Sequence, residues 1–203
     1  MWRWGNNSVI EARNPHFLRV EYVTTLMLTL TDLAQLLVFI LPAYFANAAP
    51  VLFKTGRSKT PMDMKMRFYD SRRVLGEGKT WVGFFTGVAA GTAVGYLTWA
   101  LGMLRIYPTM EQHLLVAFLL SLGTMTGDVI GSFLKRRLAM RKGKPLFLMD
   151  QLSFYVVAIL FILPWRPQSL DIAMFIVLGA VTALVHYYAN VLAYKAELKR
   201  VPW

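Results

Sequence analysis

The sequence predicts an all-α, polytopic integral membrane protein with five transmembrane helices, an outside N-terminus and a cytoplasmic C-terminus. Apolar residues gather in runs long enough to cross a hydrocarbon layer of roughly 30 Å, which takes about 20 helical residues. Most Lys and Arg residues lie between these runs, on one side. The 203-residue chain is 56% hydrophobic and 16% charged. Because the runs show no alternation with a period of two, they indicate helices and not the strands of a barrel.

Four of the predicted spans are clear, and one is short. The purely apolar stretch 152–163 reaches spanning length only if its helix begins at residue 146, which places Asp150 inside it. The predicted helices cover residues 24–46, 81–104, 114–134, 146–163 and 172–194. We expect one membrane domain, 1–203, with an interfacial N-terminal segment at 1–23 and cytoplasmic loops at 50–80 and 135–145.

The positive charge predicts the orientation. The two loops and the C-terminal tail hold 17 of the 22 Lys and Arg residues. Because cytoplasmic loops carry an excess of these residues, the loops and the C-terminus are placed in the cytoplasm of a cell-membrane protein. The net charge of +11 suits anionic partners such as phosphates and acidic lipid headgroups. The apolar runs argue against a soluble nucleic-acid-binding domain, and the absence of cysteine excludes disulfides and thiolate metal sites.

Four glycines in the second predicted helix follow a spacing of four: Gly83, Gly87, Gly91 and Gly95. This spacing places them on one helix face, where small residues let another helix approach closely. We expect a packing ridge without chemistry, and the same ridge is compatible with a homo-oligomer.

Two carboxylates are predicted at similar shallow depth near the cytoplasmic side. Asp128 lies about 9 Å from the end of the third helix, and Asp150 lies near the start of the fourth. Charges at membrane depth are costly and mark candidate sites. Two adjacent carboxylates repel unless a cation lies between them, and oxygen ligands favour Mg²⁺ over zinc. The alternative is that Asp128 pairs with Lys135 or Arg136 and Asp150 with a loop cation.

Cationic and hydroxyl residues surround this position. Thr124, Asp128, Gly131, Ser132 and Lys135 form one polar helical stripe. The candidate phosphate-binding residues from three segments are Lys79, Thr80, Lys135, Arg136 and Lys144. The sequence GEGKT does not form a P-loop, because the first glycine would fall at an arginine and no strand precedes it. For any single Lys or Arg, the alternative to phosphate binding is that it only follows the positive-inside rule and attracts anionic lipid.

The last helix carries His186, Asn190 and Tyr194 at intervals of four, on a face that we expect to line the same cavity. A histidine in a span is as often an interhelical hydrogen-bonding residue, which is the interpretation favoured for His186, with catalysis as the alternative. Asn47, at the end of the first helix, is likewise either a cavity residue or an interhelical hydrogen-bonding residue. Asp32 is expected in the outer half of that helix, far from the two carboxylates.

Several motifs resemble the CTP-dependent cytidylyltransferases that make CDP-activated lipids, and most closely the archaeal CDP-archaeol synthases. One match is Gly127-Asp128, Ser132 and Lys135-Arg136, followed by Asp150 in MDQLSF. Further similarities are Lys79-Thr80-Trp81, LPAYFANAAP around Asn47, Asp70 and Arg73 before GEGKT, and a tail with His186, Asn190, Tyr194, Lys195 and Pro202-Trp203. Ser153 stands where the broad family commonly has another acid, so only Asp128 and Asp150 match as metal ligands.

The resemblance implies that a membrane-embedded isoprenoid glycerol-phosphate lipid attacks the α-phosphorus of CTP and expels pyrophosphate. It implies catalytic roles for Asp128, Asp150 and Lys135, with Mg²⁺ on the two acids. It also implies nucleotide- and phosphate-binding roles for Asn47, Asp70, Arg73, Lys79, Thr80, Ser132, Arg136 and Asn190.

The sequence leaves two rival functions open. A CTP-dependent polyprenol kinase would share the membrane, the magnesium and the cations but would transfer the γ-phosphoryl group. A small ion-coupled transporter would be built on Asp32 and His186, although the chain lacks the paired repeats usual for such carriers.

Overall fold

The computed structural model describes residues 15–55, 60–76, 78–103, 106–139 and 147–198, with side chains from residue 30 in the first helix and from residue 152 in the fourth. The described chain is helical, as predicted. The elements are α1 (Pro15–Leu52), α2 (Trp81–Ala100), α3 (Met110–Arg137), α4 (Phe147–Phe161), the short 3₁₀ turn η2 (Leu163–Trp165) and α5 (Ile172–Lys195). The described extended pairs are two isolated bridges, Pro61 with Thr80 and Arg67 with Arg73.

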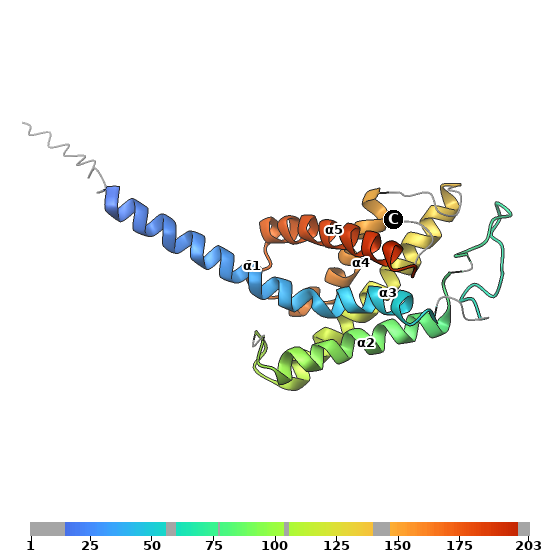
Figure 1. Ribbon diagram of the computed structural model, residues 1–203, viewed down its shortest axis with the longest axis horizontal. Helices are drawn as coiled ribbons and strands as arrows, with labels where there is room; N and C mark the ends of the chain where they lie inside the picture. The colour runs from blue at the N-terminus through green and yellow to red at the C-terminus, as the bar shows by residue number, and fades with distance from the viewer. Residues whose placement is uncertain (1–14, 56–59, 77, 104–105, 140–146, 199–203) are drawn as a thin grey trace, which may run out of the picture.

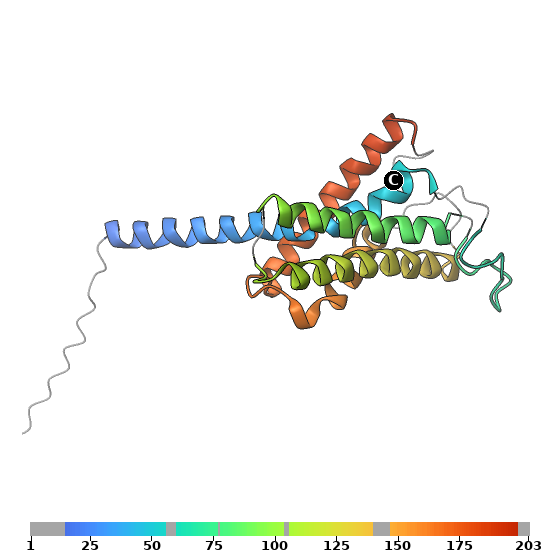
Figure 2. The same ribbon diagram turned by 90° about the horizontal axis from the view of Figure 1, so that it is seen from below.

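The helices form one bundle around α3. Helix α3 packs most extensively against α4 and α2, and α2 packs against the second half of α1. Helix α5 lies mainly against α4 and makes fewer contacts with α1. The first half of α1 extends beyond the bundle, and the segment between α1 and α2 lies at the opposite end (Figure 1, Figure 2).

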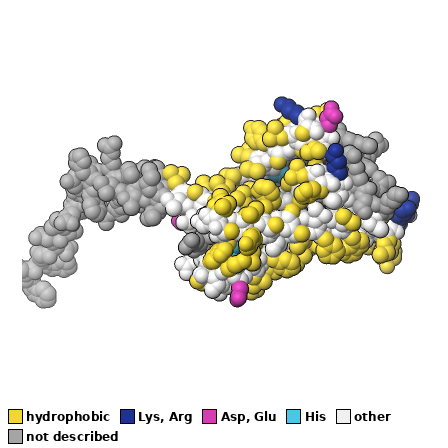
Figure 3. Space-filling model, turned by 60° about the horizontal axis from the view of Figure 1, so that its bottom comes forward, with side chains coloured by type: hydrophobic (Ala, Val, Ile, Leu, Met, Phe, Trp, Pro, Cys, Tyr) yellow, Lys and Arg dark blue, Asp and Glu magenta, His cyan; other side chains and the backbone are white. Residues whose placement is uncertain are grey.

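The helices have the length and surface of an integral membrane protein. Within the described residues, Leu30–Leu52, Met110–Arg137 and Ile172–Lys195 are long and apolar enough to cross a bilayer. Large apolar side chains on α5 remain exposed, including Ile172, Ile176 and Leu192, as expected where lipid replaces water. Hydrophobic side chains dominate the face shown in Figure 3, and the visible Lys and Arg side chains lie on the half away from the free end of α1.

Several helix boundaries differ from the sequence expectation. Helix α1 begins at Pro15 instead of residue 24, because proline suits the first helical turn and a helix does not need apolar residues to begin. It also continues past residue 46 to Leu52, where Pro50 packs toward Gly83 of α2. Helix α2 ends at Ala100, before residue 104. Helix α3 runs to Arg137, so Lys135 and Arg136 belong to its last turn and not to a loop.

The predicted glycine ridge of α2 is a packing surface inside the bundle. A Cβ added at Gly91 would lie 2.2 Å from Ser121 Oγ and 2.4 Å from the backbone oxygen of Pro42. Both distances are far below van der Waals contact, so α1 and α3 approach α2 closely only because the side chain is absent. The ridge is therefore occupied by the chain itself.

The hydrophobic core lies at one end of the bundle and leaves the other end open. Buried Leu36 and Ile40 of α1 meet Leu120 of α3, Tyr155 of α4 and Leu178 of α5. A cavity is surrounded instead by later residues of α1, α3 and α5, by the start of α2, and by Ser153 and Phe154 of α4. This division places the cavity at the end where α2 begins and α3 ends.

Candidate active site

A cavity of about 630 Å³ opens between all five helices at this end of the bundle. Its polar lining includes Lys79 and Thr80 before α2, Asp128 and Lys135 of α3, and Ser153 of α4. Helices α1 and α5 supply most of the apolar lining. The cavity therefore brings charged groups and an apolar wall into one space.

The central contact is an ion pair between Lys79 and Asp128. The Lys79 Nζ donates to Asp128 Oδ2, and the two side chains are 25% and 31% exposed. Lys135, seven residues after Asp128 on the same helix face, lines the same cavity. The sequence alternative paired Asp128 with Lys135 or Arg136, whereas the structure pairs it with Lys79, 49 positions away.

Local hydrogen bonds fix the backbone around Lys79. Thr80 is the N-cap of α2: its hydroxyl accepts from the backbone N–H of Gly83 at 3.0 Å and donates to the carbonyl of Thr55 at 3.0 Å. The backbone N–H of Met62 donates to the carbonyl of Lys79 at 2.8 Å. Thr80 lines the cavity, but its hydroxyl already serves the cap.

A second glycine series brings α4 against Asp128's helix. Added Cβ atoms at Gly127 and Gly131 would each lie 2.7 Å from an atom of Ser153, the carbonyl oxygen and Oγ respectively. Together with Gly123 they repeat every four residues, a signal in the sequence that identifies a packing face as readily as the ridge of α2. This close approach lets Ser153 reach the cavity.

The α1–α5 side of the cavity is joined by two side-chain hydrogen bonds. Tyr44 Oη and Thr182 Oγ1 are 2.8 Å apart, and Asn47 Nδ2 and His186 Nε2 are 3.3 Å apart. Asn190 also lines the cavity, whereas exposed Tyr194 is not among its lining residues. His186 therefore has an interhelical hydrogen-bonding partner, as the favoured interpretation of its sequence position expected.

Four candidate residues are not among those that line the cavity. Ser132 Oγ donates to the backbone oxygen of Asp128 at 2.9 Å. Asp70 accepts from Arg137 Nη1 at 2.7 Å, and Arg73 pairs with Asp63. Arg136 lies next to Gly76, where an added Cβ would be 3.8 Å from its Nε.

Lys144 and the side chain of Asp150 lie outside the described residues. Asp150 belongs to the first turn of α4, three residues before Ser153. Within the described part, no three His, Asp or Glu side chains cluster as a ready-made metal site.

Sequence reasoning missed Asp63 and Arg137. Asp63 carries no periodic or motif signal, and its contacts come from residues up to 13 positions away. Burial alone would raise the pKa of its carboxyl, but Arg73 and the backbone N–H groups of Gly76, Leu75 and Lys65 outweigh burial and lower the pKa from 3.8 to about 2.

The comparisons with known proteins agree with the motifs. A family described as "CarS-like: CDP-archaeol synthase" matches residues 27–203. A CDP-archaeol synthase of Pyrococcus horikoshii is 44% identical over 165 residues, covering 81% of this chain and 94% of that protein. One of Thermococcus onnurineus is 45% identical over 176 residues, covering 87% and 100%.

One solved structure also matches, described as an intramembrane enzyme for archaeal membrane lipid biosynthesis. It is 35% identical, with a TM-score of 0.65, and the match covers 76% of this chain and 91% of the other. Sequence and fold therefore agree over most of both chains, and this chain belongs to the CDP-archaeol synthase family.

Proposed function

We propose that this chain transfers the cytidylyl group of CTP to a membrane glycerol-phosphate lipid with isoprenoid tails, in the cavity next to Asp128. A lipid phosphate oxygen bonds to the α-phosphorus of CTP, the bond to the β-phosphate bridging oxygen breaks, and pyrophosphate leaves. The products are a CDP-lipid of the CDP-archaeol type and pyrophosphate.

One observation carries this proposal: a single cavity joins a charged end to an apolar wall. At the charged end, the ammonium groups of Lys79 and Lys135 suit phosphates, and the Asp128 carboxylate suits a cation. The wall includes Val51 and Leu52 of α1 and residues of α5 such as Leu192. A lipid phosphate and a nucleotide can meet there while the lipid tails remain against apolar side chains.

The donor chemistry fits a hard divalent cation. The Lys79 ammonium on Asp128 marks a place where the carboxylate already favours positive charge. We assign Asp128 and Asp150 as the residues that would hold Mg²⁺, since carboxylate oxygens suit it and Asp150 lies three residues before cavity-lining Ser153. When bound, Mg²⁺ neutralises phosphate charge.

The chain's own cations position the nucleotide. Lys79, just before α2, and Lys135 of α3 reach the cavity, where their ammonium groups bind the triphosphate and offset the charge that develops on pyrophosphate. Asn47, Thr80 and Asn190 line the cavity and are assigned to the nucleotide's polar surface. Asp70, Arg73, Ser132 and Arg136 are not among the lining residues, so we assign them to support of the site. Lys144 is assigned to phosphate binding by its charge.

We also propose five spans, with the cavity facing the cytoplasm. Helix α2 has 20 residues, about 30 Å, and α4 has 15 residues followed by η2. Lys79, Lys135, Arg136 and Arg137 lie at the cavity end of the bundle, which is the arrangement that positive-inside topology favours.

Product analysis tests the reaction. Purified protein is incubated with an isoprenoid glycerol-phosphate lipid and CTP labelled at either the α- or the γ-phosphate, with Mg²⁺ present or chelated. We expect the α-label in lipid and the γ-label in pyrophosphate, with both signals lost on chelation.

Other label distributions identify the rivals. The γ-label in a phosphorylated polyprenol, with free CDP, identifies the kinase and contradicts the transferase. Solute flux across vesicles without any labelled lipid, persisting in Asp128→Asn, identifies a transporter.

A further inference from the structure

Asp63 is a buried carboxylate outside the cavity. It lies in the segment between α1 and α2, and its side chain has no exposed surface. An isolated buried carboxylate is costly, so its partners must compensate for the lost hydration. None of the proposed reaction steps uses this residue.

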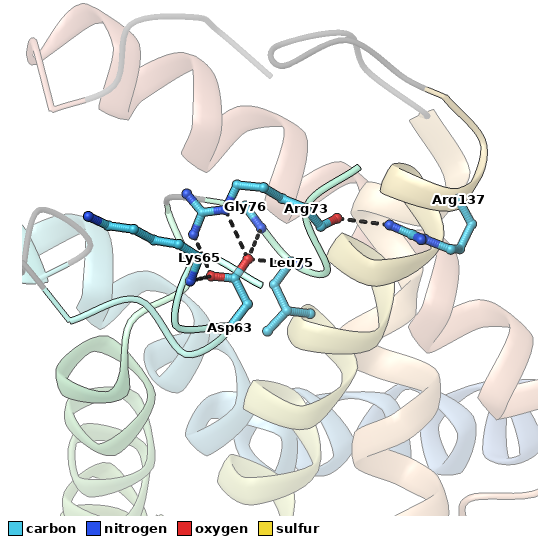
Figure 4. A network of polar contacts seen from close by, with 6 residues as sticks. All are labelled: Asp63, Lys65, Arg73, Leu75, Gly76 and Arg137. Atoms are coloured by element: carbon cyan, nitrogen blue, oxygen red, sulfur yellow. Dashed lines mark hydrogen bonds and ion pairs between the residues drawn. The ribbon is translucent and has the colours of Figure 1, made fainter. Parts of the chain in front are cut away.

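Five donors saturate both oxygens of Asp63 (Figure 4). Oδ1 accepts from Arg73 Nη2 and from the backbone N–H of Lys65 at 3.1 Å. Oδ2 accepts from Arg73 Nε at 3.1 Å and from the backbone N–H groups of Leu75 and Gly76 at 3.1 and 3.0 Å. With these donors in place, the carboxylate organises the segment's backbone and does not face a ligand.

The positive φ of Gly76 contributes to this arrangement. Its φ of +100° lies in a region that residues with a side chain rarely adopt. Consecutive N–H groups at Leu75 and Gly76 then converge on one carboxylate oxygen, as in an anion-binding nest. The chain direction immediately before Lys79 thus depends on Asp63.

The same segment is attached directly to Lys79. Met62, next to Asp63, donates its backbone N–H to the Lys79 carbonyl at 2.8 Å, and Pro61 bridges to Thr80. The Asp63 carboxylate therefore holds together two parts of the segment. Met62, beside Asp63, is bonded to Lys79, and Leu75–Gly76 ends three residues before Lys79.

The segment is also fixed to the helix that carries Asp128. Arg137 Nη2 donates to the Arg73 carbonyl at 2.8 Å, and its guanidinium lies 4.6 Å from the centroid of the Phe68 ring. Figure 4 shows Arg73 between Asp63 and Arg137. The segment around Asp63 is therefore hydrogen-bonded both to the backbone of Lys79 and to the helix that carries Asp128.

We propose that Asp63 is a positioning residue for the reaction, which through Arg73 and the backbone of residues 62–76 sets the Lys79 ammonium against Asp128 and the nucleotide phosphates. This role rests on the proposed function for its effect on CTP. Its effect on the Lys79–Asp128 pair concerns the free protein and is measured separately.

The first test is the chemical reactivity of Lys79 in the free protein. Trace acetylation followed by mass spectrometry compares wild type, Asp63→Asn and Lys65→Ala, because Lys65 contacts Asp63 through its backbone N–H alone and alanine keeps that bond. We expect Asp63→Asn to raise the acetylation rate of Lys79 about fivefold or more, because the ion pair is loosened, and Lys65→Ala to leave it unchanged. An unchanged Lys79 rate in folded Asp63→Asn overturns the proposal. Should that variant fail to fold, Arg73→Lys, which keeps the charge but loses the two-pronged contact, gives the same comparison.

The second test is a double-mutant cycle on CTP affinity, measured by calorimetry. Asp63→Asn is expected to weaken CTP binding about tenfold in the wild-type background and to have no further effect in Lys79→Ala. Additive losses contradict action through Lys79 and indicate a general structural role. A wild-type chain that makes no CDP-lipid contradicts the proposed function, whereas the acetylation result still decides the role of Asp63.

Discussion

Lys79 and Asp128 form an ion pair across the cavity. Lys79 directly precedes Thr80, the N-cap of α2, and Asp128 lies in the second half of α3. Each charge neutralises the other in a partly exposed site. In the proposed function, the phosphates of CTP attract the Lys79 ammonium and leave the Asp128 carboxylate to a metal ion.

Replacing Asp128 with Asn tests its charge at nearly constant shape. We expect turnover to fall by about 10³-fold or more, equivalent to roughly 4 kcal/mol of barrier, and the residual rate to lose its magnesium dependence. The assay is initial-rate formation of CDP-lipid. Asp32→Asn, on α1 and outside the cavity lining, is the control and should change stability more than rate. Equal losses in both variants would contradict a specific role for Asp128.

Asp150→Asn tests the second proposed metal ligand. We expect a loss of turnover similar to that of Asp128→Asn and a much weaker binding of Mn²⁺, detected by electron paramagnetic resonance, as a substitute for Mg²⁺. Ser153→Ala, one helical turn away, is the matched control and should retain most Mn²⁺ binding. Near-normal activity of Asp150→Asn shows that the metal assignment is wrong.

Gly127→Ala tests how closely α4 must approach α3. The added Cβ would lie 2.7 Å from both the Phe154 Cα and the Ser153 carbonyl oxygen, and backbone atoms cannot rotate away. We expect a loss of about 1–3 kcal/mol in unfolding free energy, seen as a lower Tm in detergent. Gly131→Ala, which meets the movable Ser153 hydroxyl at 2.7 Å, should cost less. The reverse order would contradict this packing.

The low pKa of Asp63 predicts a pH dependence of its segment. Because the folded pKa of about 2 lies below the ordinary 3.8, ionised Asp63 stabilises the fold above about pH 4, and this contribution is lost as the pH falls toward 2. The shift corresponds to roughly 2 kcal/mol. Pepsin cleavage within residues 60–76, measured from pH 4 to 2, should increase in wild type relative to Asp63→Asn, which is expected to be cleaved readily throughout. Parallel curves for the two proteins would contradict the assignment.

Helix existence was easier to predict than helix boundaries. The run of apolar residues identified α5 within one residue of its end, because a regular span has a one-dimensional signature. Helix α1 was placed too short at both ends, since hydropathy reports the lipid-facing part and not the hydrogen-bonded length. Helix α4 begins at Phe147, one residue after its predicted start at residue 146, and ends at Phe161, two residues before its predicted end at residue 163.

In the candidate site, too, some features could be predicted from the sequence and others could not. Asp128, Lys79 and Lys135 were identified by residue type and depth, and all three line one cavity. The partner of Asp128 was not identified, because several cations were equally close in sequence terms. Asp63 was missed entirely, since its environment is made by backbone N–H groups that no residue pattern encodes.

The helical membrane fold, the glycine packing ridge and the acidic and basic residues of the proposed phosphate-binding site could all be predicted from the sequence, because run length, residue spacing and charge can be read along a single chain. Tertiary structure alone decided that Lys79 faces Asp128, that Asn47 meets His186 across α1 and α5, and that Asp63 holds the intervening segment. These contacts join residues far apart in the chain, and their distances depend on how closely helices pack and on where the backbone turns.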